Sequence, residues 1–91
     1  MSTILYHSNF LKRYKKRIKS VPHLHQKFIR RIKIFSYSPS ELILRDHALK
    51  GRLKGYRAFS ITGNIRIIYR YVDKEKKKVL LIDVGTHTQI Y

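Results

Sequence analysis

The fold is decided by the stretch YRAFSITGNIRIIYRYV, residues 56–72, which alternates apolar and polar side chains on both sides of a tight turn. Residues 56–61 and 65–72 each have the period of two that is typical of a β-strand with one buried face. Between them, Thr62-Gly63-Asn64 has the composition of a hairpin turn. The stretch therefore predicts an antiparallel β-hairpin at the centre of the domain.

Two more strands extend this hairpin into a sheet. A charged turn at Asp73 to Lys77 leads into residues 78–84, a nearly continuous apolar run that is typical of a strand in the middle of a sheet. Near the N-terminus, residues 3–6 can add a short strand. The sheet is thus predicted to hold about four strands and to be mainly antiparallel.

The first half of the chain has helical periodicity instead. Ser8 or Asn9 is expected to cap a first helix, and Pro22 marks the start of a second. The second helix has an apolar stripe at steps of four, four and three residues: Leu24, Phe28, Ile32 and Phe35. We expect one α+β domain over residues 1–91, in which two N-terminal antiparallel helices pack on one sheet face and leave the other free for a ligand.

Charge is the strongest signal in the composition. Twenty-one Lys and Arg against five acids give a net charge of +16, which points to a polyanion such as nucleic acid as partner. An anionic membrane surface or an acidic protein would satisfy the same electrostatics. The chain has no cysteine, no apolar run of membrane-spanning length and no signal-peptide pattern, so a cytoplasmic protein is expected.

The five acids are too scattered to suggest a catalytic metal site. Glu41, Asp46, Asp73, Glu75 and Asp83 never cluster, whereas a two-metal nuclease needs several converging carboxylates. His23 and His25 are only two ligands and are expected to face solvent. The basic run from Lys12 to Arg17 is likewise expected to be a solvated helix face. We therefore expect no metal and no cofactor.

A metal-free ribonuclease needs a base for the RNA 2′-hydroxyl, an acid for the leaving 5′-oxygen and fixed cations for the phosphate. Histidine suits both proton transfers, and tyrosine can stack on a base or donate a proton. His47 precedes the sheet, His87 follows the last strand, and Tyr91 is the last residue. Arg57, Arg66 and Arg70 lie on the strands between them.

At these residues the chain resembles a known family. The segments Asp46-His47-Ala48-Leu49-Lys50-Gly51, Lys54-Gly55-Tyr56-Arg57 and Gly85-Thr86-His87-Thr88-Gln89-Ile90-Tyr91 look like the RelE/ParE superfamily of toxins, closest to the YafQ-like branch. The match is close over roughly the second half of the chain. The resemblance implies a toxin that cleaves messenger RNA in the ribosomal A site and is restrained by a cognate antitoxin.

The resemblance also implies roles for individual residues. His47 and His87 match the catalytic histidines of the branch, Tyr91 matches a terminal aromatic near the scissile nucleotide, and Arg66 is similar to a phosphate-binding arginine. Lys50, Lys54 and Arg57 would assist in binding RNA. Other positions depart from the pattern: Ser60 replaces a histidine, Asn64-Ile65 replaces an Asp-Trp pair, and Asp83 replaces an arginine. Asp83 could instead orient His87 or pair with Arg66.

Structural roles remain open for some of these residues. His47 could cap its loop, and Arg57 could bridge the sheet to a loop. Two other functions also remain open: a ParE-like toxin that binds DNA gyrase without catalysis, and a plain RNA- or ribosome-binding protein. In each case the charge favours an acidic antitoxin that covers the basic face.

Overall fold

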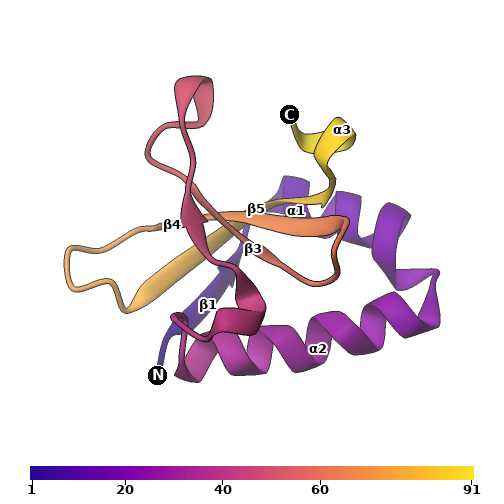
Figure 1. Cartoon of the computed structure of the whole chain (residues 1–91), viewed down its shortest axis with the longest axis horizontal. Helices are drawn as coiled ribbons and strands as arrows, with labels where there is room; N and C mark the ends of the chain where they lie inside the picture. The colour runs from indigo at the N-terminus through magenta and orange to yellow at the C-terminus, as the bar shows by residue number, and fades with distance from the viewer.

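The computed structural model describes residues 1–91, which form one mixed sheet with the two N-terminal helices on one side. The five strands lie in the order β1-β5-β4-β3-β2. Figure 1 shows α2 below this sheet, whereas the segment between β2 and β3 and the C-terminal helix α3 rise on the other side. The α+β class is confirmed, but the sheet has five strands rather than about four.

The predicted hairpin is present and forms the middle of the sheet. Strands β3 (Arg57–Ser60) and β4 (Ile65–Tyr71) pair antiparallel across the turn at residues 61–64. Strand β4 then pairs antiparallel with β5 (Lys78–Thr86). The two edges are short strands: β1 (Thr3–Tyr6), which runs parallel to β5, and β2 (His47–Ala48), which runs antiparallel to β3.

The helices begin and end close to the predicted positions. Helix α1 (Ser8–Tyr14) continues into a π-helical turn η1 (Lys15–Lys19), and α2 spans Pro22–Tyr37 with proline in its first turn. The N-cap of α1 is His7, not Ser8 or Asn9, because the His7 imidazole accepts the Asn9 N–H at 3.0 Å. A third helix that was not predicted, α3 (His87–Ile90), follows β5 directly.

Two apolar clusters lie on opposite faces of the sheet. The larger one joins the helices to alternate strand residues; Phe35 stacks on Phe59 with ring centroids 4.5 Å apart, and Tyr69 is fully buried beside them. The smaller cluster lies on the other face, which we call the open face, and consists of Leu49, Ala58 and Ile68. The helix-side core sets the register, so the intervening side chains must point to the open face.

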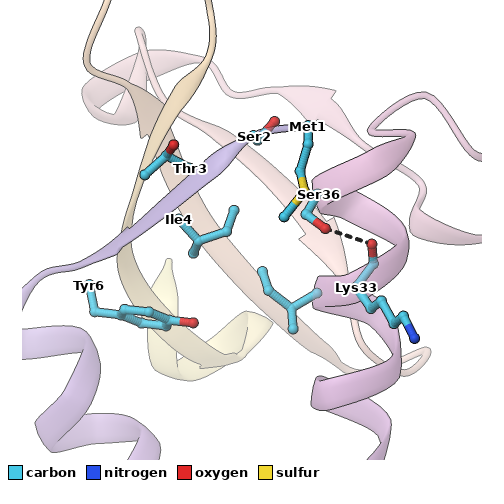
Figure 2. A pocket seen from close by; sticks show the side chains of 8 residues that line it. Met1, Ser2, Thr3, Ile4, Tyr6, Lys33 and Ser36 are labelled. Atoms are coloured by element: carbon cyan, nitrogen blue, oxygen red, sulfur yellow. Dashed lines mark hydrogen bonds between the residues drawn. The ribbon is translucent and has the colours of Figure 1, made fainter.

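The largest surface hollow, about 530 Å³, lies between β1 and α2 on the helix side. Figure 2 shows Ile4 and Tyr6 facing Lys33 and Ser36 across it, with the Ser36 hydroxyl donating to the Lys33 carbonyl at 2.8 Å. None of the predicted site residues lines this hollow. Separately, none of the helices is both long enough and apolar enough to span a membrane.

Candidate functional site

The strand register carries the predicted residues onto the open face. His47 pairs with Ala58, and Ala58 pairs with Ile68. Directly paired residues share a face, so His47 lies on the same face as the Ala58–Ile68 cluster. Arg66 and Arg70 lie two residues on either side of Ile68 and therefore share this face as well.

Helix α3 brings the C-terminal residues over the same face. Ile90 and Tyr91 pack against the open-face cluster, and the rings of His87 and Tyr91 lie 4.6 Å apart. A capping box, in which Thr86 and Gln89 hydrogen-bond to each other's backbone N–H, begins the helix. At its other end, Arg52 donates to the Tyr91 carbonyl at 2.7 Å. Tyr91 is therefore held in place and is not frayed.

A polar hollow of about 330 Å³ lies between the hairpin tip and α3. It is lined only by polar residues and glycine: Gly63, Asn64, Arg66, Thr86, His87 and Thr88. Arg66 and His87 thus face one space, and the Tyr91 ring contacts that of His87 at a tilt of 45°. A phosphate in this space would have a guanidinium and an imidazole within reach.

The backbone before β2 fixes the orientation of His47. Arg45 has a left-handed conformation (φ 49°), which is uncommon for a residue other than glycine. Its carbonyl lies 2.9 Å from His47 Nδ1. A carbonyl oxygen can only accept, so Nδ1 carries the proton. The neutral ring then presents an unprotonated Nε2 that can act as a base.

The side chain next to His47 belongs to a half-buried network instead. Asp46 accepts from Arg57 Nε at 2.8 Å and from its Nη2 at 2.6 Å, and it also accepts the Tyr69 hydroxyl proton. Burial raises the pKa of Tyr69, and the hydrogen bond to Asp46 raises it further. Burial alone would lower the pKa of Arg57, but the contacts with Asp46 and Tyr69 outweigh it and raise that pKa. Arg57 therefore bridges the sheet to the loop, the structural role left open above, rather than extending toward the open face.

Two other predicted RNA-binding residues lie in the segment between β2 and β3. Lys50 and Lys54 flank a short 3-10 turn η3 (Gly51–Leu53), and both are exposed. Leu53 and Tyr56 from this segment pack against the open-face cluster. The two lysines are therefore placed at the rim of the open face, next to Arg52.

Asp83 contacts neither His87 nor Arg66, so both of the expectations for it are wrong. Its carboxylate pairs with Arg13 at 3.0 Å and with Arg17 at 3.6 Å. Strand β1 pairs with β5 only as far as Leu81, and beyond this point α1 lies against β5. The arginines of the first helical segment therefore reach Asp83, and they are not part of a fully solvated face.

Arg17 also supports the base of α3. Its Nη1 donates to the Val84 carbonyl at 2.8 Å. A Cβ placed on Gly85 would lie 2.6 Å from Gln89 Oε1 and 2.8 Å from Arg17 Nη1. Only glycine leaves room for both side chains, which hold the turn before His87.

The structure thus brings together Arg66, His87 and Tyr91 but keeps His47 apart from them. Strands β3 and β4 separate β2 from β5, which corresponds to about 14 Å at the usual strand spacing. The two imidazoles therefore flank the open face from opposite sides. The supporting contacts of Arg17 and Arg52 could not be predicted from the sequence. Only the capping box of α3 has a sequence signal, because Gln89 follows Thr86 by three residues.

His23 and His25, near the start of α2, lie away from this face. His25 is hydrogen-bonded to the Tyr14 hydroxyl at 2.6 Å and is half-buried, so the expectation that it faces solvent is wrong. His23 is exposed. Nowhere in the chain do three His, Asp or Glu side chains converge as metal ligands would.

Comparison with known proteins identifies the family. The model of the bacterial toxin YafQ of type II toxin–antitoxin systems matches residues 2–91. The fold is similar to YafQ from E. coli strain BL21(DE3), with 22% identity, a TM-score of 0.75 and coverage of 100% of this chain and 99% of that one. It is also similar to a YoeB/ParE toxin from Agrobacterium tumefaciens, with 19% identity, a TM-score of 0.76 and coverage of 93% and 98%.

A third similar structure is the E. coli DinJ-YafQ complex, with 26% identity, a TM-score of 0.68 and coverage of 100% and 99%. No curated protein sequence matches significantly. The family model spans nearly the whole chain, including the open face and α3. The chain therefore belongs to the YafQ family of bacterial toxins of type II toxin–antitoxin systems.

Proposed function

We propose that this toxin is a metal-independent endoribonuclease that cleaves messenger RNA on the ribosome and acts in the cytoplasm. The observation that carries the proposal is the polar hollow shared by Arg66 and His87, with the Tyr91 ring packed against His87. It offers a cation for a phosphate, an imidazole for proton transfer and an aromatic ring for a base, which RNA cleavage requires.

In the proposed reaction the 2′-hydroxyl of the substrate attacks the adjacent phosphorus. His47 Nε2 takes the hydroxyl proton, because its Nδ1 is already committed to the Arg45 carbonyl. The P–O5′ bond breaks, and His87 gives a proton to the leaving 5′-oxygen. The products are a 2′,3′-cyclic phosphate and a 5′-hydroxyl. The 2′- and 5′-oxygens of one phosphodiester lie only a few Å apart, so both histidines can act on one linkage only if the short edge strand β2 carries His47 toward His87 when RNA binds.

The remaining residues bind and position the strand. Arg66 neutralises the charge that grows on phosphorus, as a fixed guanidinium does for phosphoryl oxygens. Tyr91 stacks on a base or donates a proton, and Lys50 and Lys54 add phosphate contacts from the rim. Arg57 supports these roles through Asp46, which precedes His47.

The proposed restraint on this activity is a cognate acidic antitoxin. The related YafQ is known in complex with DinJ. At +16, the chain would attract an acidic segment to its basic surface. An antitoxin that covers the open face would exclude RNA from Arg66 and His87.

The test is message cleavage by purified wild type and His87→Gln in a translating extract. His87 is exposed and makes no side-chain hydrogen bond in this structure, so the replacement should leave the thermal unfolding temperature unchanged. We expect at least a hundredfold slower cleavage, since general acid catalysis contributes about 10²–10⁴-fold. Undiminished cleavage by the variant would refute the assignment. Inhibition of gyrase supercoiling without any RNA cleavage would favour the ParE-like alternative.

A further inference from the structure

A second cationic hollow lies on the opposite side of the β3–β4 hairpin tip from His87. Its volume is about 380 Å³, and three of its lining residues are cations: Lys27, Arg31 and Arg45. No acid lines it, and serine, threonine and glycine provide most of the rest. In contrast, the neighbouring hollow at Tyr71 contains Glu41 and Asp46 beside its cations. The hollow at Lys27 therefore carries an uncompensated positive charge.

One cation of this hollow, Arg31, is held in place before any ligand binds. Arg31 Nη1 donates to the carbonyls of Ile43 and Ser60, both at 3.1 Å. A guanidinium has five N–H donors, so others remain for a ligand. The left-handed backbone of Arg45, whose carbonyl also orients His47, sets the direction in which its side chain leaves the main chain. Pre-ordered groups bind with a smaller loss of conformational entropy.

The hollow adjoins the candidate catalytic site at the hairpin tip. Gly63, at the hairpin tip, lines both this hollow and the one shared by Arg66 and His87. Ser60 lines the second hollow and pairs directly with Arg66, which in turn pairs with Gly85. One row across the sheet therefore leads from the base of α3, past Arg66, to the cations beyond β3.

An exposed apolar surface borders the same hollow. Leu42 is 90% exposed and Ile43 is 52% exposed, and both line it. Exposed apolar side chains next to fixed cations suit a ligand that has both flat apolar groups and negative charge. A single RNA strand has both, as bases and phosphates.

We propose that the hollow at Lys27, Arg31 and Arg45 is a second phosphate-binding site, an inference that rests on the proposed function. It would hold the backbone of the RNA strand where the strand continues past the hairpin tip from the cleaved nucleotide. A base of this segment would lie on Leu42. The site lengthens the footprint on RNA and leaves the chemistry to the open face.

The test compares two charge-matched double variants of the full chain. Lys27→Gln with Arg45→Asn removes two cations from the hollow, and asparagine tolerates the left-handed backbone of residue 45. Lys74→Gln with Lys77→Gln removes two exposed cations from the β4–β5 turn, at the far end of the sheet. The probes are a 12-nucleotide and a 3-nucleotide fluorescent 2′-O-methyl RNA, which cannot be cleaved. Fluorescence anisotropy gives the affinity of each over a range of salt concentrations.

For the 12-nucleotide probe we expect the hollow variant to bind about tenfold more weakly. Its log–log salt slope should also fall by about 1.4, because each phosphate contact with a single strand contributes about 0.7. The 3-nucleotide probe should be unaffected, and the turn variant should retain the wild-type slope. If the double variant unfolds, the single variant Lys27→Gln replaces it in the test, because Lys27 is exposed on a helix. This variant should lower the slope by about 0.7.

Equal losses in both double variants would refute the second site, as would equal losses with the two probes. The second site is also refuted if the hollow variant binds RNA as wild type does but loses affinity for an oligo-glutamate peptide of similar charge. The surface would then suit an acidic protein. Message cleavage by wild type is measured in parallel. A wild type that leaves translated message intact refutes the proposed function, whereas a cleaving wild type with unchanged slopes refutes only the second site.

Discussion

Replacing Gly85 by alanine should displace α3 and slow cleavage while lowering the stability of the fold only slightly. The added methyl would lie 2.6 Å from Gln89 Oε1 and 2.8 Å from Arg17 Nη1. Both are far ends of flexible side chains, so they can move, but each already makes a hydrogen bond of 2.8 Å. Gln89 accepts the Thr86 N–H, and Arg17 donates to the Val84 carbonyl. The methyl therefore disrupts the two contacts that hold the turn before His87.

The cost in stability is small. Losing two hydrogen bonds costs about 0.5–1.5 kcal/mol each. The glycine lies outside the left-handed region, so alanine also returns about 0.4–1 kcal/mol by restricting the unfolded chain. The net loss is about 1 kcal/mol, which for a domain of this size lowers the melting temperature by about 5 °C. A shift of about 1 Å in His87, in contrast, would slow cleavage about a hundredfold.

The assay pairs thermal unfolding by circular dichroism with the initial rate of message cleavage. Wild type, Gly85→Ala, Gln89→Ala and the double variant form a double-mutant cycle. Because Gln89→Ala removes one of the two clashing side chains, the methyl should cost less in that background. The reasoning is refuted if Gly85→Ala cleaves at the wild-type rate, or if its effect is the same with and without the Gln89 side chain.

The remaining predictions concern stability. Asp46→Ala leaves the buried Tyr69 hydroxyl without its acceptor and Arg57 without its partner, so urea denaturation should show a loss of about 2 kcal/mol, and Tyr69→Phe a smaller one. An equal stability of Asp46→Ala and wild type would contradict this network. Backbone N–H groups of Lys78 and Lys77 hold the pKa of Asp73 below its usual value of 3.8, so its charged form stabilises the folded state above that pH. The difference in melting temperature between wild type and Asp73→Asn should therefore be present at pH 7 and shrink as the pH falls below 4. A difference that is constant with pH would show that the charge is irrelevant.

The sequence predicts the parts of the fold that depend on local periodicity. The alternation on each side of Thr62-Gly63-Asn64 and the stripe from Leu24 to Phe35 correctly predicted the central hairpin and α2. In contrast, β2 has only two residues and no period to detect. The parallel pairing of β1 with β5 joins residues about as far apart in sequence as the chain allows, and no local pattern encodes it.

The candidate site shows the same division. The histidines and Tyr91 stand out by residue type, but the contacts that support them come from distant segments. Arg17 reaches β5 from the first helical segment, and Arg52 reaches the C-terminus from the loop before β3. A bulge in the pairing of β4 with β5, at Ile68 and Tyr69, interrupts the alternation of side chains along β5. As a result, the next core residue after Leu81 is Val84 and not residue 83. Asp83 therefore could not be placed by counting alternate residues.

The parallel pairing of the first strand with the last long one bears on when this toxin becomes harmful. Residues 3–6 have no partner in the sheet until residues 78–81 have been synthesised. At about 5–20 residues per second, a ribosome needs several seconds to make a chain of this length. His87 and Tyr91 follow residues 78–81 in the chain and therefore appear later still. Under the proposed function, a nascent chain can therefore cleave message only after these segments have been made and paired, which gives an antitoxin time to meet it.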